Sequence, residues 1–143
     1  MILIRPGNFQ KCIVLSKKIP EFDFPYDVTE YEKRCSDGHL TLNAFVGEKP
    51  AGFKVGYDRF KDGSFYIWMG GVLPQYRKQG VASSLANNQE EWARKKGFSS
   101  IRLKTWKRHQ AMLEFCIQRG FKIIKKIPKN FDSESRIWLE KQL

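Results

Sequence analysis

The spacing of hydrophobic residues changes several times along the chain, and each change predicts a different element. Short runs rich in β-branched and aromatic residues predict strands at 2–4, 40–47, 51–60, 65–73, 101–106, 121–127 and 135–140. Apolar residues at helical spacing predict helices at 8–18, 28–36, 80–96 and about 111–120. The order β-α-α-β-β-β-α-β-α-β-β predicts a mixed α/β sheet with helices packed on both faces.

The same segments indicate how the strands pair. The runs 40–47, 51–60 and 65–73 follow one another through tight turns at 48–50 and 61–63, which predicts an antiparallel meander. Residues 65–106 form a strand, a helix and a strand, and this unit needs a right-handed crossover and a parallel pair. We therefore expect a mostly antiparallel central sheet.

Capping residues mark the helix ends. Asn8 and Asp27 precede two of the predicted helices and suit N-cap positions. Gly97 and Gly120 follow two others, and each is followed by a phenylalanine, which is typical of a left-handed C-terminal stop.

Length and composition narrow the class of protein. The chain has 143 residues, which predicts one domain over residues 1–143. No apolar run approaches the roughly 20 residues that span a bilayer, and the N-terminus lacks a signal-peptide core. We expect a cytoplasmic protein with no membrane partner. The net charge of +11 suits nucleic acid, a polyanionic cofactor or a solvated lysine-rich surface, and does not choose among them.

The cysteines do not predict a disulfide framework or a metal site. Cys12, Cys35 and Cys116 are odd in number and widely spaced. They lack zinc-site spacing, and His39 and His109 do not complete one. Each cysteine is most simply a small buried hydrophobe.

The segment 75–84 carries the clearest chemical pattern. It joins a strand to a helix through a loop rich in donors, and a helix N-terminus with free N–H groups binds phosphate. Arg77 and Lys78 add positive charge, and Gly80 lets a ligand approach the backbone. The Gly-Lys-Ser/Thr ending of a nucleotide P-loop is absent. By pattern alone, an ordinary strand–loop–helix connection is the alternative.

These residues resemble a known family. Residues 77–82 match the Gln/Arg-x-x-Gly-x-Gly/Ala signature of the GNAT superfamily of N-acetyltransferases. Residues 72–77 are similar to its V-x-P-x-Y-R approach, and 111–121 to its A-x-x-L-Y-x-x-x-G-F segment. The similarity is firm over 40–125. Strand, signature, helix, strand and Gly-Phe stop in this order make it specific.

The resemblance implies a sheet splayed into a V, with acetyl-CoA as cosubstrate and no metal. It implies a bulge in the strand before the signature, where Gly70 and Gly71 suit a bulge. It also implies that main-chain atoms of Gly71, Val72 and Leu73 contact pantetheine, and that the Val72 N–H polarises the thioester carbonyl. The pyrophosphate would be held by Arg77, Lys78, Gln79, Gly80, Val81, Ala82 and Ser83.

The chain departs from the family in two places near the chemistry. Cys116 stands where many members have a tyrosine that protonates the departing thiolate, so it is either a replacement acid or, as we favour, a core side chain. Arg108 stands where an asparagine is frequent. It could pair with a phosphate of coenzyme A or be a solvated residue at a helix start.

The sequence does not single out a general base or an acceptor pocket. Candidate bases are Glu21, Asp23, Glu30, His39 and Asp58, each of which is more often a solvated or capping residue. Tyr66 and Trp68 could line the acceptor cleft or lie in the core. By the resemblance, the aromatic loop 22–26 forms part of the acceptor pocket.

The leading hypothesis is transfer of an acetyl group from acetyl-CoA to a primary amine by direct attack. The second is a CoA-binding module with weak or lost catalysis. The third is a basic nucleic-acid-binding domain, which ranks last because no recognisable motif for it is present. The acceptor is not identified, and a homodimer remains open.

Overall fold

A computed structural model of the chain describes residues 1–36 and 38–143 and contains a seven-stranded sheet in the order β1-β2-β3-β4-β5-β7-β6. Its strands are β1 (Ile2–Pro6), β2 (His39–Val46), β3 (Lys49–Tyr57), β4 (Ser64–Val72), β5 (Ser100–Trp106), β6 (Lys122–Ile127) and β7 (Arg136–Gln142). Its helices are α1 (Phe9–Ser16), α2 (Val28–Arg34), α3 (Val81–Lys95) and α4 (Gln110–Gln118). The predicted order of elements is confirmed. Within the described residues, no helix is both long and apolar enough to cross a membrane.

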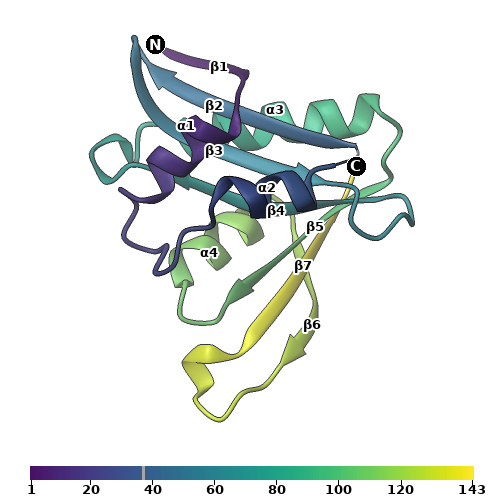
Figure 1. Ribbon diagram of the computed structural model, residues 1–143. Helices are drawn as coiled ribbons and strands as arrows, with labels where there is room; N and C mark the ends of the chain where they lie inside the picture. Colours follow the sequence, from purple (N-terminus) through teal and green to yellow (C-terminus); the bar gives the residue numbers. More distant parts are fainter. Residues whose placement is uncertain (37) are drawn as a thin grey trace.

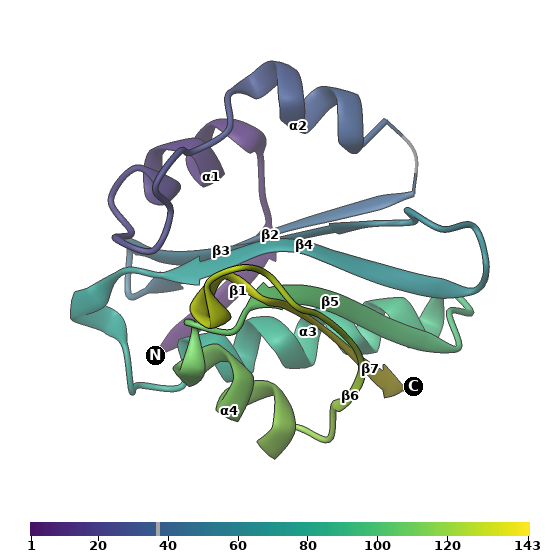
Figure 2. The ribbon, with the colours of Figure 1, turned by 90° about the horizontal axis from the view of Figure 1, so that it is seen from below.

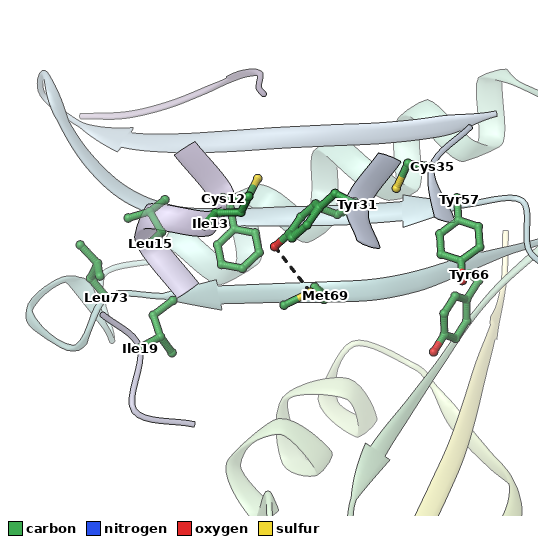
Figure 3. Close-up of a cluster of buried hydrophobic side chains, with 12 residues drawn as sticks. Cys12, Ile13, Leu15, Ile19, Tyr31, Cys35, Tyr57, Tyr66, Met69 and Leu73 are labelled. Carbon is green, nitrogen blue, oxygen red and sulfur yellow. Dashed lines mark hydrogen bonds between the residues drawn. The ribbon is translucent and has the colours of Figure 1, made fainter. Parts of the chain in front are cut away.

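The helices cover both faces of the sheet (Figures 1 and 2). Helices α1 and α2 lie over β2, β3 and β4 on one face, and α3 and α4 lie on the other. The core under α1 and α2 includes Cys12, Tyr31, Phe53 and Met69, and the Tyr31 hydroxyl points at the Met69 sulfur at 3.6 Å (Figure 3).

The opposite face carries two further clusters. One joins α3 to the first strands through Val81 and Leu85. The other joins α4 to β4, β5 and β7 through buried residues that include Phe65, Leu103 and Leu113. Both predicted N-caps are present, because Asn8 accepts a hydrogen bond from the Lys11 N–H at 2.9 Å and Asp27 accepts one from the Glu30 N–H at 3.1 Å.

Both predicted boundaries of strand β3 are wrong. The turn before β3 lies at 47–48, one or two residues earlier than expected, where Gly47 has φ 63°. Strand β3 ends at Tyr57 rather than at residue 60, because Asp58 accepts a hydrogen bond from the Lys61 N–H at 3.2 Å and turns the chain. Gly97 and Gly120 have φ values of 93° and 96°, as the predicted helix stops require.

The sheet opens between its only parallel neighbours among the described strands. Strand β4 pairs with β5 only from Ser64 to Ile67, whose partner is Leu103. Beyond this point both strands continue, β4 to Val72 and β5 to Trp106, without pairing to each other. The two strands diverge there, as Figure 1 shows, and we call the place where they are no longer paired the gap.

The bulge of β4 lies at Trp68, not at the predicted Gly70–Gly71. Val55 of β3 is opposite Met69 and Gly56 is opposite Ile67, so Trp68 is the extra residue. Gly70 and Gly71 keep regular register. The bulge therefore coincides with the point where β4 leaves β5, and a bulge bends a strand and increases its twist.

Candidate active site

Backbone donors at the start of α3 form the first part of the site. Gly80 is the N-cap residue with φ 90°, and no side chain caps the helix. The first hydrogen bond into the helix runs from the Ser84 N–H to the Gly80 oxygen at 3.0 Å. The N–H groups of Val81, Ala82 and Ser83 have no acceptor within the described residues. They are free to bind an anion, and the helix dipole favours one.

The loop before α3 keeps this terminus open to solvent. Residues 77–80 are exposed, and Lys78 adopts a positive φ of 62°. A Cβ at Gly80 would approach only the Ile2 Cδ1 atom, at 3.7 Å. The space above the Gly80 backbone is therefore free for a ligand, and a side chain there would also be strained by the left-handed backbone.

The end of β4 places main-chain groups at the gap. The Leu73 N–H donates to the Ala51 oxygen of β3 at 2.8 Å, so it is already bonded inside the sheet. Because successive residues of a strand turn their N–H groups to opposite sides, Val72 turns its main-chain N–H and C=O away from β3 and toward the gap. The Val72 oxygen accepts from Arg77 Nε at 3.1 Å, and Gly70 is exposed. Of Gly71, Val72 and Leu73, Val72 thus has the free N–H beside the gap.

Packing explains why residue 71 is a glycine. A Cβ there would lie 2.8 Å from Ile19 Cδ1 and 3.1 Å from Phe22 Cε2. Its missing side chain lets the segment after α1 pack directly on β4, which fixes the predicted acceptor loop against the strand.

Arg77 binds a carboxylate rather than open solvent. Its guanidinium makes two bonds to Glu21, with Nη1–Oε2 at 3.0 Å and Nη2–Oε1 at 2.8 Å. The hydrogen bond from Arg77 is the main cause that lowers the pKa of Glu21. Glu21 is therefore a carboxylate at neutral pH and a weak base.

The same loop also reaches the start of α4. Asp23 lies 3.5 Å from Nη2 of Arg108, and the Arg108 guanidinium stacks 4.6 Å above the Trp106 ring. Burial and the Arg108 charge lower the pKa of His109, while Glu21 and Asp23 act in the opposite direction. Residues 21–23 thus contact both sides of the gap, β4 through Arg77 and α4 through Arg108.

The other proposed bases have partners elsewhere. Glu30 bonds Arg34 at 2.6 Å, and Asp58 lies 3.8 Å from Lys61. His39 of β2 pairs with Tyr57 at one end of β3. Gly52, which pairs with Val72, lies toward the other end. The structure brings Glu21 and Asp23 to the gap but not His39 or Asp58.

Cys116 and Tyr66 are core side chains on opposite faces of the sheet. Cys116 is 2% exposed in the α4 cluster, and burial raises the pKa of its thiol to about 11. Tyr66 is 4% exposed and lies edge-on to Tyr57, 5.6 Å between ring centroids. Burial also raises the pKa of Tyr66.

Lys54 is a candidate that the sequence prediction missed. It is 8% exposed on β3, opposite the exposed Gly70, and its Cγ lies 3.3 Å from where a Gly70 Cβ would be. Burial lowers the pKa of its ammonium group, and the titratable groups that act on it are Cys116, Arg119 and Glu90. The feature of the sequence that could have revealed Lys54 is its position in the middle of the otherwise apolar strand 51–57.

Comparisons with known proteins concern the family and the fold. The family model described as "Acetyltransferase (GNAT) family" matches residues 11–121. The ribosomal-protein-S18-alanine N-acetyltransferase from Escherichia coli superposes with a TM-score of 0.84 at 15% identity, over 99% of this chain and 94% of that one. Ard1 from Thermoplasma volcanium superposes with a TM-score of 0.83 at 19% identity, over 99% and 97%.

An acetyltransferase from Bacillus subtilis, solved in complex with CoA, gives a TM-score of 0.77 at 19% identity, over 100% of this chain and 99% of that one. No curated protein matches the sequence. These structural likenesses concern the fold. The family match spans most of the chain, so the chain belongs to the GNAT family of acetyltransferases.

Proposed function

We propose that residues 1–143 form one catalytic domain that transfers the acetyl group of acetyl-CoA to a primary amine. The observation that carries the proposal is the open N-terminus of α3, where Val81, Ala82 and Ser83 present free N–H groups beside the gap between β4 and β5. Such a terminus suits a pyrophosphate. The gap beside it suits the extended pantetheine arm.

Coenzyme A enters from the α3 and α4 side. The main chain of residues 77–83 holds its pyrophosphate, and the charge of Lys78 adds to the attraction. The edge of β4, from the exposed Gly70 to Val72, binds pantetheine through main-chain atoms. The Val72 N–H polarises the thioester carbonyl, which stabilises negative charge on its oxygen during attack.

The amine approaches from the α1 and α2 side, past Trp68 and the loop held by Glu21. The reaction needs no covalent enzyme intermediate, because holding the amine and the thioester together in a reactive orientation supplies much of the acceleration. The amine attacks in its neutral form: its nitrogen bonds to the acetyl carbon, the carbon–sulfur bond breaks, and the proton that the nitrogen then loses passes to solvent and balances the one that the departing thiolate takes up.

The departing thiolate takes a proton, and Lys54 is better suited than Cys116 to supply it. An ordinary thiol titrates near about 8.5, so transfer from a Cys116 thiol with a pKa of about 11 is uphill by roughly 3 kcal/mol. The pKa of Lys54 is lowered by burial, which makes its ammonium a stronger acid than an exposed lysine. Cys116 of the α4 cluster is among the groups that act on Lys54, so Lys54 also lies on the face of the sheet from which coenzyme A enters.

The experiment is an acetyl-CoA turnover assay across a panel of primary amines, in which the release of the free thiol is measured. We expect turnover with some of the amines and none in protein whose pyrophosphate loop is blocked by Gly80→Asp. Acetyl-CoA binding without turnover across the panel would favour a CoA-binding module. No binding would contradict the proposal.

A further inference from the structure

A group of cations lies on the face of the sheet from which the amine approaches. Residues of β5 and β7 alternate in direction, and Leu103, Ile137 and Leu139 pack toward α4. Lys104 and Arg136 therefore point to the opposite face. Helices α1 and α2 cover the β2–β4 side of that face and not the β5–β7 side (Figure 2).

Four of these cations lie at aromatic rings beside the gap, Arg59 and Lys104 at the same Trp138 ring, and we name this group of side chains the cationic cleft: Arg34, Arg59, Lys104 and Arg136. Lys104 directly follows Leu103, the last β5 residue paired with β4. Burial lowers the pKa of Lys104, and so do the charges of Arg136, Arg59 and Arg34, in that order. No carboxylate is among the groups that act on it.

Two neighbouring cations outside the cleft are paired with carboxylates, but most of those inside it are not. Arg102 bonds Glu140 at 2.5 Å, and Arg108 pairs with Asp23. Within the cleft, Arg34 pairs with Glu30. Among the residues that the structure describes, no carboxylate forms an ion pair with Arg59, Lys104 or Arg136.

Arg136 also has a hydrogen-bond donor without an acceptor. Its Nε atom is buried without a hydrogen-bond partner in the described part of the chain. Burial lowers the pKa of its guanidinium, and the charge of Arg108 adds to this effect. A buried donor left without an acceptor destabilises the protein, and more so when it is charged. An acceptor from outside the chain would remove that cost.

Aromatic rings hold the cleft cations in place. Arg136 lies 4.0 Å above Trp106, Lys104 lies 5.3 Å from the Trp138 ring, and Arg34 lies 5.0 Å from the Trp68 ring. These contacts keep the like charges together at a surface of low polarity, where electrostatic attraction to an anion is stronger than in bulk water.

We propose that the acceptor amine carries an anionic group, a carboxylate or a phosphate, which binds Lys104 and Arg136 while the amine faces the gap. This inference rests on the proposed function, because it names the substrate class of the same site. Charge-assisted hydrogen bonds from an arginine and a lysine provide the recognition. The same cations repel polyamines and other acceptors that are purely cationic.

The test uses anion binding and needs no turnover. Succinate and its neutral analogue succinamide are titrated at low salt, and binding is followed by tryptophan fluorescence, since Trp68, Trp106 and Trp138 line the cleft. Inorganic phosphate is titrated into protein saturated with coenzyme A, so that the α3 N-terminus is occupied. The variants are Arg136→Gln and Lys104→Gln. The matched control is Arg94→Gln, which removes an exposed arginine at the end of α3.

We expect succinate or phosphate to bind and succinamide not to bind. Each cleft variant should weaken anion binding about tenfold, consistent with the loss of one charge-assisted hydrogen bond, and Arg94→Gln should leave it unchanged. If Arg136→Gln fails to fold, Lys104→Gln carries the test. No anion binding, or equal binding in the cleft variants and the control, would overturn the inference.

Two matched amine pairs then separate carboxylate from phosphate in the turnover assay: β-alanine with β-alaninamide, and phosphoethanolamine with ethanolamine. The pair whose charged member is acetylated about tenfold more efficiently identifies the anion. Acetyl-CoA binding is measured in parallel. An absence of acetyl-CoA binding would contradict the proposed function and would not change the succinate result. Turnover that favours the neutral amines would contradict only the anionic acceptor.

Discussion

The guanidinium of Arg77 and the carboxylate of Glu21 form a bidentate pair, with N–O distances of 3.0 and 2.8 Å. These residues are far apart in sequence, and the pair joins the loop before α3 to the loop after α1. Arg77 is the first residue of the stretch assigned to pyrophosphate binding, yet its side chain faces the acceptor loop. Its side chain therefore positions that loop, while the main chain around it is left for the pyrophosphate.

We predict that removing this pair weakens acceptor binding while leaving stability and acetyl-CoA binding nearly unchanged. Both side chains are well exposed, at 39% and 48%, and exposed ion pairs contribute about 0–1 kcal/mol. Glu21→Gln should therefore change the free energy of unfolding by less than about 1 kcal/mol. We expect it to raise the acceptor KM several-fold and to leave the acetyl-CoA Kd within about threefold, as should Arg77→Gln. A tenfold loss of acetyl-CoA affinity in Arg77→Gln alone would show that the side chain binds the phosphates directly.

The second prediction concerns the left-handed backbone at Gly80. Asparagine and aspartate tolerate this conformation better than other residues and have nearly equal volumes, so Gly80→Asn and Gly80→Asp should lose similar stability. Both side chains obstruct the pyrophosphate, and only aspartate also repels it. Calorimetry should show weakened acetyl-CoA binding in Gly80→Asn and none in Gly80→Asp. Equal, near-normal binding in both variants would mean that the phosphate does not lie above Gly80.

The third prediction separates Cys116 from Lys54. Cys116→Ala removes a buried thiol that keeps its proton at neutral pH, so we expect kcat to stay within a few-fold and stability to fall by about 1–2 kcal/mol. Lys54→Met keeps the length of the side chain and removes the acid. It should lower kcat about 10- to 100-fold, at or below the lower end of the usual range for general acid catalysis, because a thiolate is already a good leaving group.

Steady-state kinetics with the acetyl-CoA KM measured alongside kcat decide between the two residues. An unchanged kcat in Lys54→Met, together with a hundredfold loss in Cys116→Ala, would reverse the assignment.

The fourth prediction concerns stability and pH. Glu90 of α3 is 7% exposed and bonds Arg119 at 2.9 Å and Lys141 at 2.6 Å. Burial alone would raise the pKa of Glu90, but these two cations outweigh it and the pKa is lowered from the ordinary 4.5. Glu90→Gln should cost about 2–3 kcal/mol at pH 7, somewhat less than for a fully buried pair because Lys141 is partly exposed. Glu91→Gln is the matched control, since its exposed pairs are worth about 0.5 kcal/mol.

The sign of the pH dependence follows from the lowered pKa. The stabilisation from Glu90 is present above the pKa of an unfolded glutamate and is lost as the pH falls through the lower folded value. Urea unfolding should therefore show a gap between parent and Glu90→Gln that is full at pH 7 and narrows below pH 4.5. A gap that stays constant down to pH 3 would contradict the assignment.

The elements could be predicted because local patterns determine them. Asn8, Asp27, Gly97 and Gly120 mark helix ends through their own backbone preferences, and each lies where it was expected. The bulge could not be placed in the same way. Gly70 and Gly71 suit a bulge locally, but the close approach of Ile19 to Gly71 and the loss of β5 pairing after Ile67 are tertiary facts.

The candidate site likewise has one part that the sequence could predict and one part that it could not. The α3 N-terminus is one contiguous stretch, so residues 77–83 could be proposed from the sequence. The cationic cleft draws Arg34, Lys104 and Arg136 from three separate elements, and nothing local distinguishes them among the 26 lysines and arginines of the chain. Only the tertiary fold, through strand pairing and the packing of α2 on the sheet, brings them together and shows which cations lack a carboxylate.

The most direct test of the central claim is the melting temperature with and without acetyl-CoA, in the parent and in Gly80→Asp. A ligand that binds only the native state at about 100 times its Kd adds roughly 2.7 kcal/mol, which for a domain of this size is a rise of about 5–10 °C. We predict this rise in the parent and none in Gly80→Asp. No shift in the parent at millimolar acetyl-CoA, or an equal shift in the variant, would contradict the account.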